Sequence, residues 1–175
     1  NIGIFTSFRD CINLLSVGGI SGDITVYVYN GTYNEQIIIP ELNNSSATGT
    51  VTFKAVANNT PIISWTPQRY PDDNYGGYEA NKAEITLLEG ASVGFDGLMC
   101  KLAGNQQWGG HINAEQAGKV TITNCVFVGP TNALDMVDPV FSVVLDGVGP
   151  FTVHNNQVLS MPLGIAVSAS SPEVS

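Results

Sequence analysis

Three acidic residues stand at similar places in the second half of the chain. Glu89, Glu115 and Asp146 each precede a similar hydrophobic segment by four or five residues. If those segments stack, the three carboxylates gather near one corner. Two carboxylates about 5 to 9 Å apart suit glycoside hydrolysis, and closely grouped carboxylates also bind calcium. The pattern favours a solvated acidic turn over either site, and calcium over catalysis.

A second acidic stretch, residues 71–79, contains enough oxygen ligands for one calcium ion, namely Asp72, Asp73 and Glu79. Its spacing differs from that of an EF-hand, so a plain aromatic-rich loop is the favoured interpretation. Such a loop could also stack on sugar rings or fill a groove of a partner. The aromatic side chains that would do so are Trp65, Tyr70, Tyr75 and Tyr78.

Other catalytic patterns are weak. His111 and His154 have no cysteine or carboxylate at ligand spacing, so we expect each to be a satisfied or an exposed polar residue. No G-x-S-x-G element supports a serine nucleophile. The cysteines are predicted to be small buried hydrophobic residues, with a single disulfide left open. These are Cys11, Cys100 and Cys125, which lack C-x-x-C spacing. We expect no cofactor, and a bound calcium ion is the one possibility left open.

Charge and hydropathy exclude several partners. The formal net charge is −9, with 15 acidic against 6 basic residues, so phosphate backbones and anionic lipid would repel the chain. No apolar run approaches the roughly 20 residues that span a bilayer. Only 12% of the residues are charged, and neutral polar residues are plentiful. This balance favours an extracellular or cell-surface β-rich protein whose signal peptide has been removed.

The start of the chain predicts one helix, over about residues 7–17. Ser7 is a typical N-cap with Asp10 three residues later, and Gly18-Gly19 provides the stop. Beyond it the hydrophobic period changes to two, which predicts strands at residues 24–29 and 37–39.

A weak repeat follows in the second half. The segments VGFDGLMCKL, VTITNCVFVG and FTVHNNQVLS begin at Val93, Val120 and Phe151, 27 and 31 residues apart. Asn124 and Asn155 coincide at a corner, and another short strand precedes each segment. A unit of this length without helices predicts a solenoid, because each coil buries its inward side chains against its neighbours. An antiparallel sandwich is the alternative, but it has no reason to repeat a corner in register.

The predicted fold class is therefore all-β: a single-stranded right-handed parallel β-helix of about six coils with an N-terminal capping helix, about 30 Å long. We expect one domain over residues 1–175. Residues 1–20 form the N-terminal segment and capping helix, residues 21–170 the coils, and residues 171–175 a tail.

The stretch GDITVYVYNGTYNEQIIIPE, residues 22–41, resembles the first coil of pectin lyase-like right-handed β-helix proteins. In particular it resembles the β-helix domains of large secreted bacterial surface proteins. The resemblance covers about the first 65 residues. Beyond them, only the pattern of the coils is similar. It implies that Gly31 takes a corner conformation, Tyr33 packs, and Glu35 accepts backbone hydrogen bonds at the turn.

The catalytic motifs of enzymes with this fold are missing. The chain has no Q-D-T-L, D-F-I-F-G or L-G-R-P-W as in pectin methylesterases, and no G-H-G or R-I-K as in polygalacturonases. Pectate lyase chemistry needs a basic residue, but the two arginines are Arg9, in the predicted helix, and Arg69, in a loop. The resemblance therefore favours a protein that is not an enzyme.

The sequence thus predicts a non-catalytic extracellular structural or adhesive protein of a bacterial surface. In the sharper form of this hypothesis, subunits join head to tail into a filament, so that the partner is the protein itself or a cell-surface glycan. The residues expected to mediate assembly are Ile2, Ile4, Phe5, Ile165 and Val167. The alternative is a carbohydrate-active enzyme or glycan-binding module.

Overall fold

The computed structural model describes residues 3–42, 49–66, 83–103, 109–130, 141–147, 149–161 and 163–169. Within them the chain is all-β apart from one short helix, α1 (Phe8–Gly18). All pairs of neighbouring strands in the described sheets are parallel, so an antiparallel sandwich is excluded there. This arrangement is consistent with the predicted parallel β-helix.

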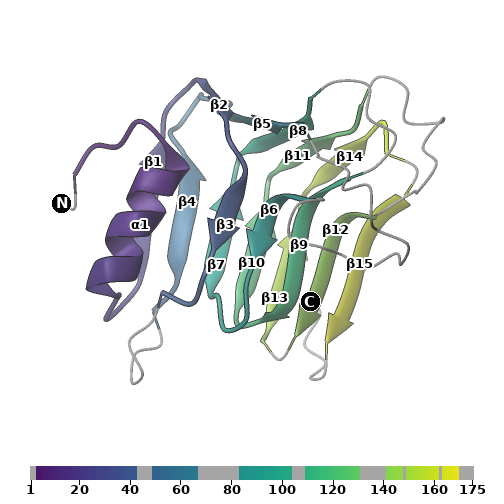
Figure 1. Cartoon of the computed structure of the whole chain (residues 1–175). Helices are drawn as coiled ribbons and strands as arrows, with labels where there is room; N and C mark the ends of the chain where they lie inside the picture. Colours follow the sequence, from purple (N-terminus) through teal and green to yellow (C-terminus); the bar gives the residue numbers. More distant parts are fainter. Residues whose placement is uncertain are drawn as a thin grey trace, which may run out of the picture.

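Three sheets of five strands each run side by side (Figure 1). Sheet 1 contains β1 (Ile24–Val28), β4 (Val51–Ala55), β7 (Val93–Asp96), β10 (Val120–Thr123) and β13 (Phe151–His154). Sheet 2 contains β2 (Thr32–Asn34), β5 (Ile62–Trp65), β8 (Met99–Leu102), β11 (Val126–Val128) and β14 (Gln157–Leu159). Sheet 3 contains β3 (Ile37–Ile39), β6 (Ala83–Leu87), β9 (Gly110–Ala117), β12 (Phe141–Gly147) and β15 (Leu163–Ala169).

The chain visits the three sheets in turn and then returns to the first, because neighbours within each sheet are three strands apart along the chain. A parallel pair needs such a crossover, and here the crossover consists of the strands of the other two sheets. Five strands are described in each sheet, so the predicted number of about six coils is not confirmed.

The strand register agrees with the repeat found in the sequence. Val120 pairs with both Val93 and Phe151, and Phe127 pairs with both Cys100 and Val158. Side chains that recur at every second residue point inward and are almost fully buried, as Phe95 is. Phenyl rings of successive coils stack on one another: the ring centroids of Phe53, on β4, and Phe95, on β7, lie 6.1 Å apart. The hydrophobic core therefore runs along the axis between the sheets.

A polar ladder follows the corner between sheets 1 and 2. Asn124 and Asn155 adopt the left-handed conformation, with φ of 56° and 55°, which asparagine tolerates better than most residues. Asn155 Nδ2 donates to Asn124 Oδ1 at 2.7 Å, and Asn124 Nδ2 donates to Asp96 Oδ1 at 2.7 Å. Lys54 Nζ lies 2.7 Å from Asp96 Oδ2. We call these four residues the corner ladder; each coil from β4 onward contributes one rung.

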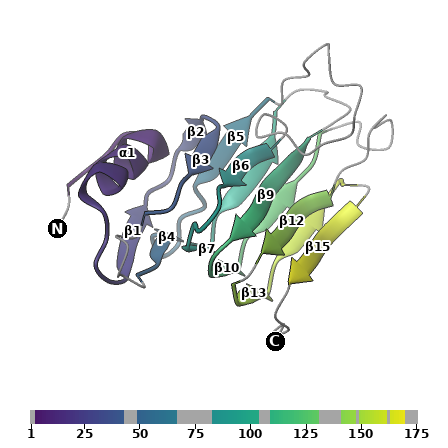
Figure 2. The same cartoon turned by 60° about the horizontal axis from the view of Figure 1, so that its bottom comes forward.

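Helix α1 begins and ends with the predicted caps. The Ser7 hydroxyl accepts from Asp10 N at 3.1 Å, and the N–H of Gly19 donates to Leu15 O at 2.8 Å. The helix lies at one end of the sheets, beside β1 and β3 (Figure 1, Figure 2). Its apolar face is buried, with Phe8, Cys11, Ile12 and Leu15 in the core.

Glu35 connects the first coil to α1 through two hydrogen bonds. Its two carboxylate oxygens accept from the backbone N–H groups of Phe8, at 2.9 Å, and Arg9, at 3.0 Å. A carboxylate at a helix N-terminus satisfies free donors and opposes the positive end of the helix dipole. Glu35 thus accepts backbone hydrogen bonds, as the resemblance implied, but from the helix start rather than from its own turn. Tyr33 packs edge-on against Phe8, with ring centroids 5.1 Å apart.

Candidate functional site

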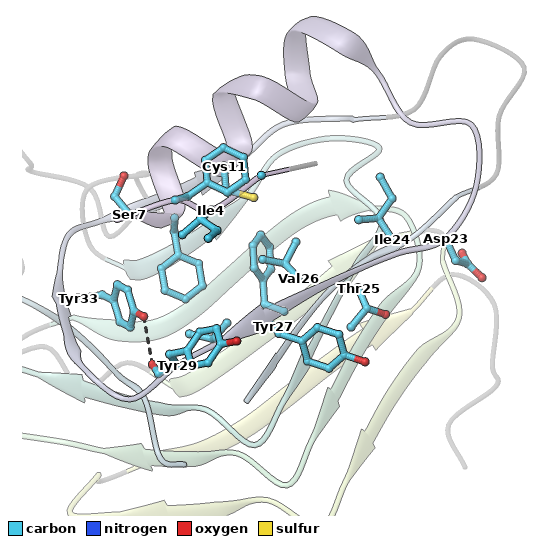
Figure 3. Close-up of a pocket in the computed structure, with 15 residues that line it drawn as sticks. Ile4, Ser7, Cys11, Asp23, Ile24, Thr25, Val26, Tyr27, Tyr29 and Tyr33 are labelled. Atoms are coloured by element: carbon cyan, nitrogen blue, oxygen red, sulfur yellow. Dashed lines mark hydrogen bonds between the residues drawn. The ribbon is translucent and has the colours of Figure 1, made fainter. Parts of the chain in front are cut away.

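An apolar groove of about 660 Å³ lies between the start of the chain and strand β1 (Figure 3). The N-terminal segment Gly3–Phe5 and the first turn of α1 form one wall. Ile24 and Val26 on β1 are only partly buried and face the core, whereas the equivalent residues of β4 and β7 are fully covered. The groove therefore exposes apolar surface that the other coils bury.

The edge of β1 that faces away from β4 carries backbone groups with which none of the described strands pairs. Ile24 N donates to Thr50 O at 2.9 Å, and Val28 O accepts from Val56 N at 2.9 Å. Since alternate residues of a parallel strand bond to opposite neighbours, the backbone groups of Thr25 and Tyr27 point to the other side. No strand of the described residues pairs with β1 there. An unpaired strand edge beside an apolar groove can accept another strand.

Two tyrosines stand on the outer face of β1 and just beyond it. The side chains of Tyr27 and Tyr29 are 62% and 67% exposed, and Figure 3 shows both rings beside the groove. The aromatic binding surface predicted from the sequence lies elsewhere. Trp65, at the end of β5, is partly buried, and Tyr75 and Tyr78 lie outside the described residues.

The residues expected to mediate assembly have unlike surroundings. Ile4 is 97% exposed, but Phe5 packs against the core of its own chain and lines the groove. At the other end of the sheets, Ile165 is partly buried and Val167 is 37% exposed. Ile2 lies outside the described residues.

The acidic corner is partly described. Glu89 and Asp146 are exposed, and Ala114 pairs with Leu145, so the backbones of Glu115 and Asp146 follow adjacent positions. The register then shifts at a bulge. The side chain of Glu115 lies outside the described part, as do Asp72, Asp73 and Glu79. The described residues contain no group of three potential metal ligands, and both calcium sites remain predictions.

Three polar residues of sheet 3 form a column that no sequence pattern indicated. Ile85 pairs with Ile112, and Ile112 with Val143, so the residues before them, Glu84, His111 and Ser142, stand in line on β6, β9 and β12. All three are fully buried. We call them the buried column. Its residue types, a carboxylate, an imidazole and a hydroxyl, are those of a hydrolase triad.

The hydrogen bonds of His111 argue against that chemistry. Its Nε2 lies 2.9 Å from the Val128 carbonyl, and its Nδ1 lies 2.9 Å from Ser142 Oγ. Because a carbonyl only accepts, Nε2 carries the hydrogen and the Ser142 hydroxyl donates to Nδ1. The carbonyl thus occupies the place that the carboxylate has in a triad, and no substrate can reach the buried Ser142. His111 is a satisfied core histidine, as expected, and His154 is exposed.

Burial dominates the acid–base properties of the buried column. It lowers the pKa of His111 to about 4, although the Val128 carbonyl acts in the opposite direction. It raises the pKa of Glu84 well above the usual value, and the nearby backbone N–H groups of Trp65 and Lys101 oppose this only in part. Neither carboxyl oxygen of Glu84 makes a hydrogen bond of accepted geometry within the described structure. His111 is therefore neutral at neutral pH, and burial favours the neutral form of Glu84.

The cysteines behave as predicted. Cys11, Cys100 and Cys125 are free and buried, so none forms a disulfide. Burial raises the pKa of each thiol, most clearly that of Cys100. Neutral buried thiols are poor nucleophiles.

Comparison with known proteins gave no match: no family model fits the chain, and no curated protein or solved structure is significantly similar to it. Among the described residues, no helix is long and apolar enough to cross a membrane.

Proposed function

We propose that this chain is a non-catalytic extracellular structural or adhesive module built as a right-handed, pectin lyase-like parallel β-helix, with α1 as its cap. Three parallel sheets visited in turn support the β-helix, and right-handed crossovers are the rule for parallel strands. The G-T-Y-N-E corner supports the family resemblance, since its glutamate fastens the helix to the first coil.

The observation that carries the structural role is the open edge of β1 in its apolar groove. A surface of this kind recruits strands rather than turning over a substrate. Self-association of subunits head to tail is the form of structural role that we propose, in an extracellular or cell-surface location. Among the described residues, the buried column has the residue types of a hydrolase triad, and the burial of its Ser142 favours a non-catalytic module.

Sedimentation and electron microscopy of the purified chain test this proposal. We expect the mean mass to rise with protein concentration and elongated particles to appear in micrographs. A strictly monomeric species at high concentration, with no elongated particles, would overturn self-association.

A glycan-binding module is the second candidate, favoured by the exposed rings of Tyr27 and Tyr29. Aromatic faces on a rigid strand are suited to stacking on sugar rings. Glycan-array binding that disappears in Tyr27→Ala and Tyr29→Ala variants would support this candidate. Turnover of a uronate or neutral glycan that is lost in Glu115→Gln would instead establish the carbohydrate-active alternative and refute the non-catalytic proposal.

A further inference from the structure

The strands of sheet 1 are joined by a hydrogen bond that recurs at each junction. Its donor is the first residue of one strand, and its acceptor is the carbonyl of the residue just before the next strand. Ile24 N donates to Thr50 O at 2.9 Å, Val51 N to Ser92 O at 3.3 Å, Val93 N to Lys119 O at 2.8 Å, and Val120 N to Pro150 O at 3.2 Å. All four junctions of the sheet follow this rule.

The same rule leaves one donor and one acceptor at the two ends of the sheet. On β13 the next donor in the series is Phe151 N, which faces away from β10 because Pro150 and His154 supply the carbonyls that β10 uses. On β1 the matching acceptor is the carbonyl of Asp23, the residue just before Ile24. β1 and β13 lie at opposite ends of the sheet (Figure 2). Within the described residues, one copy therefore carries the two halves of a further junction.

We propose that the groove beside β1 binds strand β13 of a second copy, in parallel and with Ile24 opposite Phe151, so that sheet 1 continues from one copy into the next. The inference rests on the proposed self-association and names its surface and register. Phe151 N of one copy donates to Asp23 O of the other, Thr25 N then donates to Phe151 O, and Thr25 O accepts from Val153 N.

Side chains fit this register. Val153 then lies opposite Val26 on the core side, where each is only partly buried within its own molecule. On the outer face Thr152 lies opposite Thr25, which continues a column that already pairs Thr121 with Thr152 and Thr25 with Thr52. Apolar residues meet apolar residues, and hydroxyls meet hydroxyls. Cross-strand pairs of this kind stabilise parallel sheets.

Helix α1 limits the contact to sheet 1, because it packs on β3 and, through Phe8, on Tyr33 of β2. It also offers apolar surface to the second copy, since Leu14 and Val17 are 48% and 89% exposed. The contact is heterologous: one surface meets a different surface, so that repetition builds a linear chain of molecules.

Engineered thiols test the register. Copies carrying Thr25→Cys and a differently tagged set carrying Thr152→Cys are mixed and mildly oxidised. Directly opposite residues of a parallel pair lie within the range of Cα separations that disulfides span. The matched control replaces the second set with Thr121→Cys, on the same outward column but one strand farther from the junction. The wild-type cysteines are buried, and wild-type protein serves as the blank.

We expect a disulfide-linked pair of unlike tags from Thr25→Cys with Thr152→Cys, and its loss with Thr121→Cys. Equal yields from the two mixtures, in protein that does self-associate by sedimentation, would overturn this junction and leave the proposed function intact. Absence of any association would overturn both.

Discussion

The corner ladder and the buried column are built by the same stacking of coils, and they differ in how their polar groups are satisfied. In the corner ladder each donating side chain bonds to an acceptor on the preceding or following coil. The side chains of Asn155 and Lys54 are also exposed to solvent. In the buried column His111 is satisfied on both nitrogens, whereas Glu84 is enclosed without a well-formed hydrogen bond. Stacking brings polar groups into line, but the surroundings decide whether they stabilise the fold.

The difference is also electrostatic. Although partial burial raises the pKa of Asp96, hydrogen bonds from Lys54 and Asn124 lower it below the usual value, so the ladder favours the charged carboxylate. In the buried column, burial instead favours the neutral forms of Glu84 and His111. The two regions should therefore respond differently to substitution and to pH.

The largest expected effect comes from removing the centre of the buried column. His111→Ala leaves the Ser142 hydroxyl and the Val128 carbonyl without their partner and opens a cavity. We expect the free energy of unfolding at pH 7 to fall by about 3 kcal/mol or more. The exposed His154 supplies the matched control, since His154→Ala should stay within about 0.5 kcal/mol of wild type. Urea titration measures both, and equal losses would contradict the distinction.

Acid should act on the same residue. The pKa of His111 is about 4 in the folded chain, against about 6.5 in an unfolded chain. Only the unfolded state takes up the proton between these values, so stability falls as pH is lowered from about 6.5 to 4, by about 3 kcal/mol. Urea midpoints measured over this range should show the slope in wild type. The slope should be reduced in His111→Gln, and an unchanged slope would contradict the assignment.

Glu84 should respond in the opposite direction. Its folded pKa is raised, so the unfolded state loses its proton first and stability falls as pH rises above the usual glutamate value. Glu84→Met, of similar volume, removes this penalty and should stabilise the protein at pH 8. The gain should shrink at pH 4.5. Destabilisation at both pH values would indicate that the carboxyl is well bonded after all.

The smallest of these effects is expected in the corner ladder. Asn124→Ala removes two hydrogen bonds and places a less tolerant residue at positive φ, so we expect a loss of about 1 to 2 kcal/mol. Asn124→Gly keeps the conformation and should lose less. Thermal unfolding of the two variants separates conformation from hydrogen bonding. Equal losses would show that the left-handed φ contributes nothing.

The stacking of the coils could be predicted from the sequence because the inward-facing apolar positions recur in each repeat. The matches of Val93 with Val120 and of Asn124 with Asn155 depend on residue types that each coil needs at a core or corner position. The helix was predictable from Ser7, Asp10 and Gly19, whose capping roles are local. The hydrogen-bonding role of Glu35 followed from its motif, but its partner, 27 residues earlier, did not.

The buried column and the groove were not predictable in the same way. Glu84, His111 and Ser142 share no residue type, and only the register of Ile85 with Ile112 and Val143 brings them into line. A register-based alignment of the strands that precede each repeat would have revealed them. The groove depends on where α1 and the segment before it lie relative to β1, and no pattern within the sequence specifies that placement.

The central claim, that β1 presents an edge used for self-association, is tested most directly by a proline at Thr25. The N–H of Thr25 points into the groove and takes no part in pairing with β4, so proline removes an edge donor while the fold is retained. Sedimentation over a range of concentrations should show association for wild type and for Thr25→Ala, and a folded monomer for Thr25→Pro. Association of folded Thr25→Pro equal to that of wild type, or a wild type that never associates, would contradict the claim.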